Sequence, residues 1–438
     1  MDEKKFAVIT YGCQMNIHES EKLAGILTSL GYKESTKTEE CDVIVFNTCC
    51  IRENAEQRAE GNIGALKKLK KKNKNLIIAV GGCMTQQPDR AKSLVEKFPF
   101  IDIVFGTHNL SNFERLLKSR QLSSKKVIEI VDEQPICEKI PMKRTSYPNA
   151  WVNIIYGCNN FCTYCIVPYV RGRERSRNFN EIVEEVETLV KEGYKEITLL
   201  GQNVNSYGND LKDGTTFSKL LYRLNEIEGN FRIRFMSSHP KDFKAELVDA
   251  IANCDKVCNY VHLPVQAGST KVLKDMNRRY TREDYLSHVK MIKEKIPNCS
   301  ISTDIMVGFP GETEEDFLDT LSLVESANFQ SAFMFVYSRR KGTKADAMEN
   351  QVDEDVKKDR IMRLIEKQNN LTTIQAKEYL NKTLIVLCED YDKRKKMYMG
   401  RDESNRMVYF KSEKDLIGEF VTVKILKTGG MSLYGEII

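Results

Sequence analysis

Three closely spaced cysteines are the clearest chemical feature of this 438-residue chain. Cys158, Cys162 and Cys165 lie in the segment YGCNNFCTYC, with three and then two residues between them. Thiolates are the preferred protein ligands of iron–sulfur clusters, and three on one loop can each bind one iron of a [4Fe–4S] cluster. The fourth iron then lacks a ligand from this motif, and an open metal position is typical of a catalytic site. Structural zinc is the alternative, but it usually takes four protein ligands in paired Cys-x2-Cys arrangements.

A second set of cysteines has no common spacing, but its members share a position relative to strands. Cys13, Cys49 and Cys83 each close an apolar segment that predicts a strand: AVITYGC, VIVFNTC and IIAVGGC. Because the carboxyl ends of parallel strands share one edge of a sheet, we expect the three thiols to converge there and bind a second cluster. Gly12, Gly81 and Gly82 permit close approach of the backbone to a bulky group. Burial as structural cysteines is the alternative for each one alone.

The remaining seven cysteines are interpreted as structural or unassigned. Cys50 directly follows Cys49, and we expect its side chain to point elsewhere. Cys254 and Cys258 have helical spacing, but no further cysteine nearby completes a site. The other four receive the same structural interpretation: Cys41, Cys137, Cys299 and Cys388.

Strand and helix patterns alternate through most of the chain. Residues 1–140 contain four short apolar segments separated by charged helical stretches, which predicts a parallel α/β sheet. Pro135 and Pro141 bracket a predicted linker. Residues 141–372 repeat the alternation six times, with strands expected within 151–157, 196–203, 232–240, 260–266, 300–311 and 331–338. Six such units predict a partial (β/α)6 barrel.

The last segment, residues 373–438, changes character. Short apolar pieces separated by charged turns predict a small antiparallel barrel of about five strands. Its basic cluster is the run 393–396 (KRKK). Fold class is therefore α/β, in three domains: 1–140, 141–372 and 373–438.

Composition indicates an intracellular enzyme. Lysine and arginine outnumber the acidic residues by 67 to 62, a net charge of +5 that permits an anionic partner without indicating one. The N-terminus lacks the pattern of a secretory signal, and the apolar runs are too short to span a bilayer. An odd number of cysteines, thirteen, argues against a disulfide framework. We therefore expect a cytoplasmic protein with no membrane partner.

The Cys158–Cys165 motif resembles the signature of the radical S-adenosylmethionine (SAM) superfamily. That resemblance implies that SAM binds the open iron through its amino and carboxylate groups. Electron transfer from the cluster then cleaves SAM to methionine and a 5′-deoxyadenosyl radical. Tyr164, between the second and third cysteines, stands where the superfamily often places a side chain near the adenine.

The chain as a whole resembles the methylthiotransferase family of radical SAM enzymes. The segments TYGCQMN, NTCCIRENAE and AVGGCMTQQ are similar to the three cysteine segments of its N-terminal domain, and LLGQNVNSYG, HLPVQAGS and STDIMVGFPGET to its later barrel strands. The C-terminal segment resembles a TRAM domain, a small RNA-binding barrel. Within the family, GCQMN, FGTHNL and WVNIIYGC are most similar to the MiaB branch, which acts on tRNA.

The resemblance implies conversion of N6-isopentenyladenosine beside the anticodon of tRNA to its 2-methylthio derivative, with two SAM molecules and two [4Fe–4S] clusters. Cys158, Cys162 and Cys165 would bind the radical SAM cluster, and Cys13, Cys49 and Cys83 the auxiliary cluster. A small electron-donor protein such as a flavodoxin or ferredoxin, and a monomeric state, are expected. The alternatives are methylthiolation of threonylcarbamoyladenosine in tRNA or of a ribosomal-protein aspartate, and a non-catalytic RNA-binding redox sensor.

Polar residues at the ends of the barrel strands are candidates for SAM contacts. Gln202, Asn203 and Gln266 lie there, as do Ser238, His239 and Asp304, on the rim where such barrels carry their active sites.

A separate feature is a run of alternating arginines just after the cysteine loop. In an extended segment they would share one face, suited to phosphate or to the SAM carboxylate, with a solvated strip as the alternative. These are Arg171, Arg173, Arg175 and Arg177.

Overall fold

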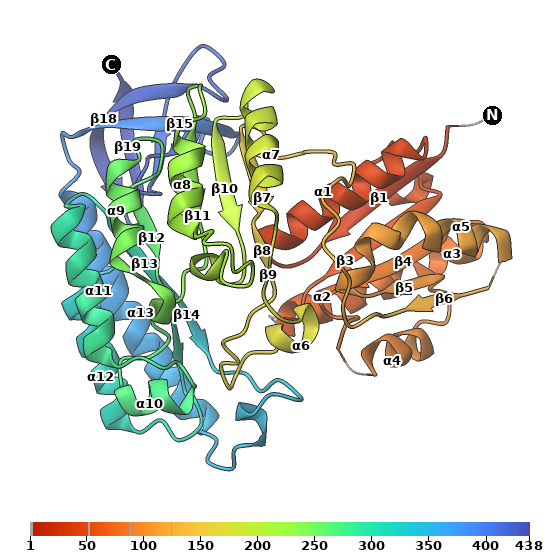
Figure 1. The fold of residues 1–438 in the computed structure, drawn as a ribbon, viewed down its shortest axis with the longest axis horizontal. Coiled ribbons are helices and arrows are strands. Elements are labelled where there is room, and N and C mark those ends of the chain that lie inside the picture. Colours follow the sequence, from red (N-terminus) through yellow and green to blue (C-terminus); the bar gives the residue numbers. More distant parts are fainter. Residues whose placement is uncertain (1–2, 51–52, 88, 124) are drawn as a thin grey trace. The chain divides into compact units, whose positions relative to one another are not determined.

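The apolar segments of the first third of the chain form a parallel sheet in this computed structural model, which describes residues 3–50, 53–87, 89–123 and 125–438 (Figure 1). The strand order is β2-β1-β3-β4-β5-β6, and every pairing is parallel. The strand bounds are β1 (Lys5–Thr10), β2 (Lys33–Glu34), β3 (Val43–Thr48), β4 (Ile77–Gly82), β5 (Ile103–Phe105) and β6 (Val127–Glu129). The four strands expected from sequence are β1, β3, β4 and β5. The edge strands β2 and β6 are only two and three residues long, too short for a periodic signal.

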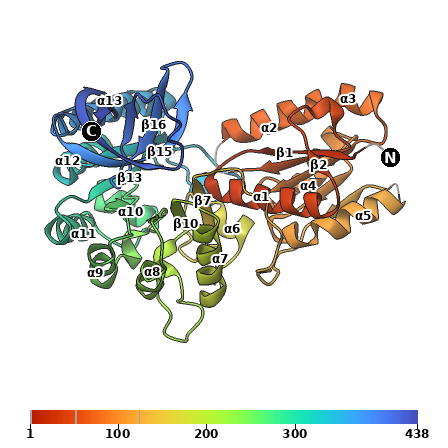
Figure 2. The ribbon, with the colours of Figure 1, turned by 90° about the horizontal axis from the view of Figure 1, so that it is seen from above.

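Helices cover both faces of this sheet, because side chains along a strand alternate between its faces. Val43 and Val45 of β3 pack with α1 and α5, whereas Ile44 and Phe46 pack with α2 and α4. Figure 2 shows α1 and α2 on opposite sides of β1. The helix bounds are α1 (Gln14–Ser29), α2 (Glu53–Ala65), α3 (Lys67–Lys72), α4 (Arg90–Lys97) and α5 (Phe113–Ser123).

The middle of the chain contains the six strands expected from sequence. They form two parallel three-stranded sheets, β11-β10-β7 and β12-β13-β14, which an isolated bridge between Ile233 and Val257 links. Consecutive strands therefore follow one another as in an open, partial barrel. The strand bounds are β7 (Asn149–Asn153), β10 (Glu196–Leu200), β11 (Arg232–Phe235), β12 (Tyr260–His262), β13 (Ser300–Val307) and β14 (Ser331–Val336). Two short strands, β8 (Ile155–Tyr156) and β9 (Arg175–Ser176), bracket the cysteine loop and α6 (Val167–Arg171).

Amphipathic helices alternate with these strands and bury their apolar faces in one large core. Helix α7, for example, buries Ile182, Val183, Val186 and Leu189 at helical spacing. The helix bounds are α7 (Phe179–Lys191), α8 (Phe217–Asn225), α9 (Ala245–Asn253), α10 (Thr270–Asp275), α11 (Arg282–Lys295), α12 (Glu314–Ala327) and α13 (Glu354–Lys377). Short 3-10 helices are η1 (Thr38–Glu40), η2 (Thr107–Asn112), η3 (Val204–Ser206), η4 (Pro240–Asp242) and η5 (Ala345–Ala347).

The C-terminal segment forms a closed five-stranded barrel in the order β15-β16-β17-β19-β18. The antiparallel pattern expected from sequence holds for four of its pairings, but β17 and β19 pair in parallel. The difference arises because β18 intervenes between these two strands and reverses the chain direction. The strand bounds are β15 (Thr383–Asp392), β16 (Met397–Arg401), β17 (Met407–Phe410), β18 (Phe420–Gly429) and β19 (Ser432–Ile437).

A buried ionic network ties this barrel to the central strands. Glu196 of β10 is fully buried and accepts from Arg232 and Arg234 of β11, at 2.6 and 3.1 Å, and from Arg401 of β16 at 2.8 Å. Arg234 also donates to the backbone oxygen of Asp402 at 3.0 Å. The three guanidinium groups hold the pKa of Glu196 well below its usual range, despite burial.

The chain divides into two compact units. The first comprises residues 1–145, 156–159 and 166–177, and the second comprises 146–155, 160–165 and 178–438. The predicted domain boundaries at residues 140 and 372 remain predictions.

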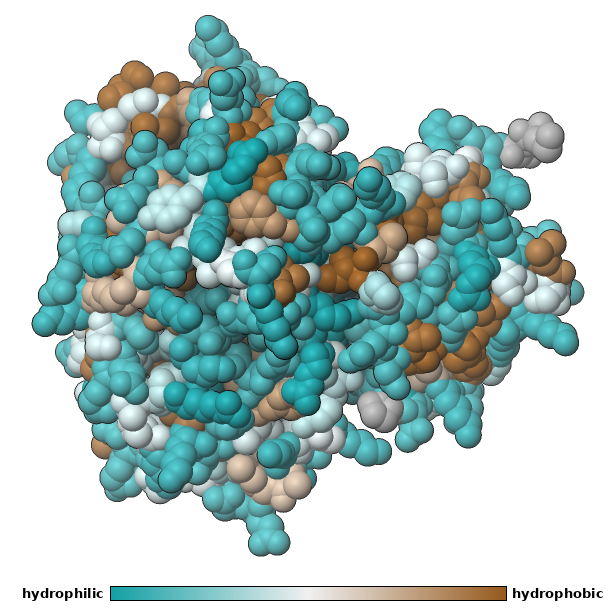
Figure 3. Space-filling model, viewed as in Figure 1, coloured by the Kyte–Doolittle hydropathy of each residue, from teal (hydrophilic) through white to brown (hydrophobic). Residues whose placement is uncertain are grey.

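Among the described residues, no helix has the length and apolarity needed to cross a membrane. Polar side chains dominate the face shown in Figure 3, and smaller apolar areas are scattered among them.

Candidate cofactor sites

The strand-end cysteines of the first unit lie at one edge of its sheet. Cys13 caps α1 just after β1, while Cys49 and Cys83 follow the neighbouring strands β3 and β4. A Cβ added to Gly12 would lie 2.5 Å from the Cβ of Cys49, so the chain beside Cys13 passes directly over Cys49. The amide of Cys83 donates to the carbonyl of Thr48 at 3.0 Å. The three strand ends are therefore neighbours at one sheet edge, and the binding of a cluster by their thiols stays a prediction.

Cys50 also belongs to this edge, contrary to the sequence prediction. Its thiol is hydrogen-bonded to Cys83, and both side chains pack with Ile166 and Val170. The prediction was wrong because β3 ends at Thr48, so strand alternation no longer fixes the direction of Cys50. The hydrogen bond from Cys50 lowers the pKa of Cys83 to about 7, and the same bond raises the pKa of Cys50. Burial raises the pKa of Cys13.

A buried arginine lies behind these thiols. Arg171 at the end of α6 donates to Glu19 Oε1 at 2.6 Å and to Asn16 Oδ1 at 3.0 Å, and it also hydrogen-bonds Cys83. Its positive charge lowers the pKa values of both Cys83 and Cys13, opposing the effect of burial. The arginine thus favours the thiolate form that a metal requires.

Asn16 joins the strand ends that carry the cysteines. Its Nδ2 donates to the carbonyls of Tyr11 and Thr48 at 2.9 and 3.0 Å, which connects the end of β1 to the end of β3. Its Oδ1 accepts from Arg171 and lies 3.7 Å from the Sγ of Cys13. Every polar atom of this side chain is therefore used to fix the thiol edge.

The run of alternating arginines does not form one face. Arg171 ends a helix, Arg173 is exposed, and strand β9 covers only Arg175 and Ser176. Arg177 donates to Glu138 at 2.6 Å. Neither alternative, a shared phosphate-binding face or a solvated strip, describes the whole segment, because it is not continuously extended and its arginines have different partners.

The loop with the other cysteine set follows β8. Within the first unit, the amide of Cys158 donates to Gly172 O at 3.1 Å. In the second unit, Asn277 Nδ2 donates to the carbonyls of Asn160 and Phe161 at 3.1 and 3.0 Å. Asn277 has a φ of 60°, a conformation that asparagine tolerates better than most residues. The segment after α10 therefore holds the backbone that leads into Cys162.

A second buried arginine lies against this loop. Arg278 Nη1 is 3.4 Å from the Sγ of Cys162, and its Nη2 donates to Pro264 O at 2.8 Å. Its Nε donates to the hydroxyl of Tyr280 at 2.8 Å. Tyr164 packs against the core of the second unit, and burial raises its pKa well above the usual range, so it contributes a neutral aromatic surface.

Polar residues lie at the ends of the central strands. Gln202 and Asn203 follow β10, Ser238 and His239 follow β11, and Gln266 follows β12. Asn203 Oδ1, Ser238 Oγ and His239 Nε2 are buried and have no hydrogen-bond partner among the described residues. His239 Nδ1 accepts from the amide of Lys241 at 3.2 Å, so its Nε2 carries the proton. Unsatisfied buried donors and acceptors of this kind fit a polar ligand at the barrel rim.

Family models match three parts of the chain. The radical SAM superfamily matches residues 152–324, the uncharacterized protein family UPF0004 matches residues 5–106, and the TRAM domain matches residues 377–438.

Two relatives share the whole length. The tRNA-2-methylthio-N(6)-dimethylallyladenosine synthase of Clostridium tetani is 55% identical over 98% of this chain and 96% of its own. The synthase of the same name from Thermoanaerobacter pseudethanolicus is 53% identical over 99% of this chain and 92% of its own. The chain belongs to the tRNA-2-methylthio-N(6)-dimethylallyladenosine synthase family. It is a radical SAM methylthiotransferase with SAM and [4Fe–4S] clusters as cofactors.

A solved structure supports the fold alone. The radical SAM methyltransferase TsrM from Kitasatospora setae superposes with a TM-score of 0.59 at 14% identity, covering 78% of this chain and 77% of its own. The α/β fold with a C-terminal barrel, expected from sequence, is confirmed.

The residues beside the cysteines of this synthase-family chain suit the two clusters in charge. Each cysteine set has one buried arginine against a thiol, which suits anionic thiolate ligands. Among the residues that the structure describes, no three His, Cys, Asp or Glu side chains already surround a point as the ligands of a single metal ion would.

Sequence reasoning missed three of the supporting residues, Asn16, Asn277 and Arg278, because their partners become visible only in three dimensions. It named Arg171, but as a candidate for phosphate or the SAM carboxylate and not as a partner of Glu19, Asn16 and Cys83. One signal was present: the asparagine of the segment MNRRY is a residue type that favours positive φ in a tight turn.

Proposed function

We propose that this protein converts N6-isopentenyladenosine beside the anticodon of tRNA to its 2-methylthio derivative, using two SAM molecules and two [4Fe–4S] clusters. Family membership supports the reaction class. The structural observation that carries the proposal is the presence of two separate three-cysteine sets, each with its own buried arginine.

The auxiliary cluster would be held by Cys13, Cys49 and Cys83. These residues lie on three neighbouring strand ends, so their relative positions are set by the sheet and not by a flexible loop. Arg171 supplies a positive charge on the protein side, and its bond to Glu19 keeps it in place. Three protein ligands leave room for a sulfur-bearing co-substrate.

The radical SAM cluster would be held by Cys158, Cys162 and Cys165, with Arg278 balancing charge at Cys162. Bound SAM and its cluster supply the radical that activates an aromatic C–H bond, for which no ordinary base suffices. Asn203, with Gln202 and Gln266, would contact SAM at the rim. His239 is neutral, because burial and then Arg278 lower its pKa, and it offers Nε2–H as a donor to an acceptor group of the ligand.

The C-terminal barrel offers a surface suited to RNA. Lys395 Nζ lies 3.4 Å from the ring centre of Tyr409, which stacks on Tyr434 at 5.3 Å. Tyr391 packs edge to face on Tyr398 at 5.0 Å and is itself 38% exposed. Aromatic rings next to lysines suit stacking of unpaired bases and contact with phosphate. This supports tRNA as the macromolecular substrate.

Further partners complete the proposal. The reaction requires electrons, so a small electron-donor protein such as a flavodoxin or ferredoxin would reduce the clusters. We propose a monomer that acts in the cytoplasm, where tRNA is modified.

Mass spectrometry of tRNA nucleosides tests the substrate. A deletion strain of the source organism should lose 2-methylthio-isopentenyladenosine and accumulate isopentenyladenosine. The wild-type gene should restore the product, and a Cys158→Ala, Cys162→Ala, Cys165→Ala triple variant should not. Unchanged product in the deletion strain would overturn the proposal. Loss of the methylthio form of threonylcarbamoyladenosine, or of a ribosomal-protein aspartate, would instead support one of the related activities.

A further inference from the structure

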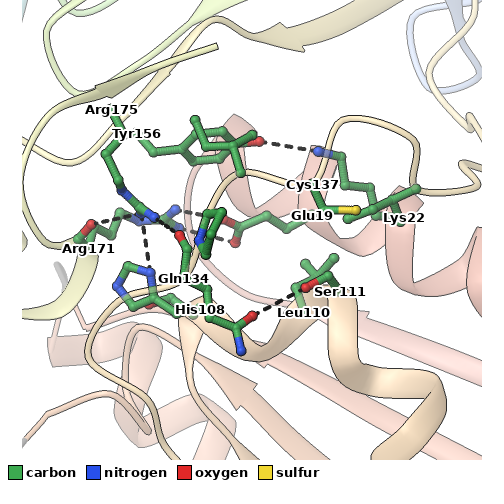
Figure 4. Close-up of a pocket in the computed structure, with 14 residues that line it drawn as sticks. Glu19, Lys22, His108, Leu110, Ser111, Gln134, Cys137, Tyr156, Arg171 and Arg175 are labelled. Atoms are coloured by element: carbon green, nitrogen blue, oxygen red, sulfur yellow. Dashed lines mark hydrogen bonds and ion pairs between the residues drawn. The ribbon is translucent and has the colours of Figure 1, made fainter. Parts of the chain in front are cut away.

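The first unit contains a pocket that neither cluster accounts for (Figure 4). It lies between α1, the 3-10 helix η2 and the segment 134–140. Lys22, Arg171 and Arg175 line it with positive charge, and Leu110, Ile136 and Ile140 supply apolar surface. A pocket with convergent polar groups and an apolar wall is typical of a small-molecule site.

Two of these cations have no counter-ion. Lys22 is 6% exposed, and its Nζ donates to the hydroxyl of Tyr156 at 3.2 Å. Arg175 donates to the carbonyl of Gln134, and its buried Nε has no partner. Within the part of the chain that the structure describes, neither Lys22 nor Arg175 has a carboxylate within 4.0 Å. A buried charge is costly unless an opposite charge offsets it.

The one carboxylate of the pocket is already used. Glu19 accepts from both terminal nitrogens of Arg171, at 2.6 and 3.2 Å, so these two charges offset each other. Glu133 raises the pKa of Arg175 but is exposed and forms no ion pair with it. Burial is the larger effect and lowers the pKa of Arg175. The pocket therefore keeps an excess of two positive charges.

His108 adds a directed donor. Arg175 Nη2 lies 3.2 Å from His108 Nδ1, and an arginine can only donate, so Nδ1 is the acceptor and Nε2 carries the proton. Burial, then the charges of Arg175 and Arg171, lower the pKa of His108 to about 4. His108 is thus neutral at pH 7 and offers one N–H to a ligand.

We propose that this pocket binds a small, singly charged anion that carries an apolar group, namely a short alkyl carboxylate. Lys22 and Arg175 supply the charge, His108 Nε2–H a hydrogen bond, and the side chains of Leu110, Ile136 and Ile140 the apolar contact. A doubly charged anion such as sulfate has no apolar group to contact these side chains, and its removal from water costs more free energy.

The pocket shares Arg171 with the thiol edge, so an occupant would lie one side chain away from Cys83. Any effect of the occupant on the auxiliary cluster rests on the function proposed above. The binding itself does not, and it is tested separately.

Cys137 provides a direct readout, because it is exposed and lines the pocket. Iodoacetate is a small, singly charged carboxylate, and iodoacetamide is its neutral isostere. In anaerobic, cluster-loaded protein, peptide mass spectrometry gives the rate at which iodoacetate modifies Cys137, divided by the rate for iodoacetamide. We expect this ratio to be higher than the same ratio measured for free glutathione. Lys22→Met or Arg175→Gln should lower this ratio about tenfold, since local charge concentrates anions by at least that factor. Lys139→Met, an exposed lysine outside the pocket, should leave it unchanged.

Thermal unfolding provides the second measurement. Propionate should raise the unfolding temperature of the wild-type protein, and Lys22→Met should abolish the shift. An equal iodoacetate preference in wild type and both pocket variants would overturn the proposal. A larger stabilisation by sulfate than by propionate would also overturn it.

Discussion

Arg171 and Arg278 each place a buried guanidinium against a cysteine that we assign as a cluster ligand. Their partners explain why arginine is needed at both positions. The guanidinium of Arg171 hydrogen-bonds Glu19, Asn16 and Cys83 at the same time. The single terminal nitrogen of lysine cannot reproduce this forked arrangement of donors. Residues that orient metal ligands typically contribute 10- to 100-fold to metal affinity.

Replacement of Arg171 by glutamine should therefore weaken the auxiliary cluster without touching its ligands. In protein that lacks Cys158, Cys162 and Cys165, only this cluster remains. We expect a chelator to bleach its absorbance about tenfold faster in Arg171→Gln than in the parent. Arg173→Gln is the matched control, because Arg173 belongs to the same segment and is exposed. Equal bleaching rates in the two variants would show that Arg171 does not support the cluster.

His108 predicts a pH dependence of stability. Its pKa of about 4 in the folded protein lies below the ordinary value of 6.5, so the unfolded chain binds the proton more readily. Stability therefore falls as pH drops through this range, by about 2 kcal/mol between pH 7 and pH 5. Unfolding in urea should show this decrease in the free energy of unfolding for the wild-type protein. For His108→Gln the decrease should be smaller by about 2 kcal/mol. An identical pH dependence in both proteins would contradict the assigned burial of His108.

At the scale of elements, the segment after α10 fixes the cysteine loop through Asn277. Asn277→Gly keeps the positive φ but removes the two hydrogen bonds to Asn160 and Phe161. We expect a looser loop, faster loss of the radical SAM cluster, and slower reductive cleavage of SAM. The control is Arg279→Gly, since Arg279 also has a positive φ and its side chain is exposed.

Cluster loss and SAM cleavage should both be measured in protein that lacks Cys13, Cys49 and Cys83. The iron content of that protein then reflects the radical SAM site alone. If Asn277→Gly retained iron and cleaved SAM as the control does, the loop would not depend on this segment.

The elements show what sequence can and cannot predict. Strands β1, β3, β4 and β5 and all six central strands were predictable, because buried parallel strands are short, continuous apolar runs. The cysteine sets were found through those strands and through local spacing. The direction of Cys50, the partners of the four arginines and the parallel pairing of β17 with β19 depend on long-range contacts, which local patterns do not encode.

Across the second unit, Glu196 links the central strands to the C-terminal barrel. Replacing it with glutamine would leave three arginines near one another without their shared counter-ion. Loss of one partner from a buried ion pair typically costs about 3–5 kcal/mol. We therefore expect Glu196→Gln to lower the unfolding temperature and to expose the segment 378–382 to proteolysis.

Glu187→Gln is the control for this effect. Glu187 pairs with Arg223 on the surface, where such a pair contributes about 0–1 kcal/mol. If Glu196→Gln and Glu187→Gln had the same unfolding temperature, the ionic network would not stabilise the contact between the central strands and the C-terminal barrel.

Iron and labile sulfide quantification, with Mössbauer spectroscopy, tests the central assignment most directly. Anaerobically reconstituted wild-type protein should contain about eight irons in two [4Fe–4S] clusters. Removal of Cys158, Cys162 and Cys165, or of Cys13, Cys49 and Cys83, should leave about four irons. Cys50→Ala should keep both clusters. Eight irons in either triple variant, or zinc in place of iron in the wild-type protein, would contradict the assignment of two independent three-cysteine sites.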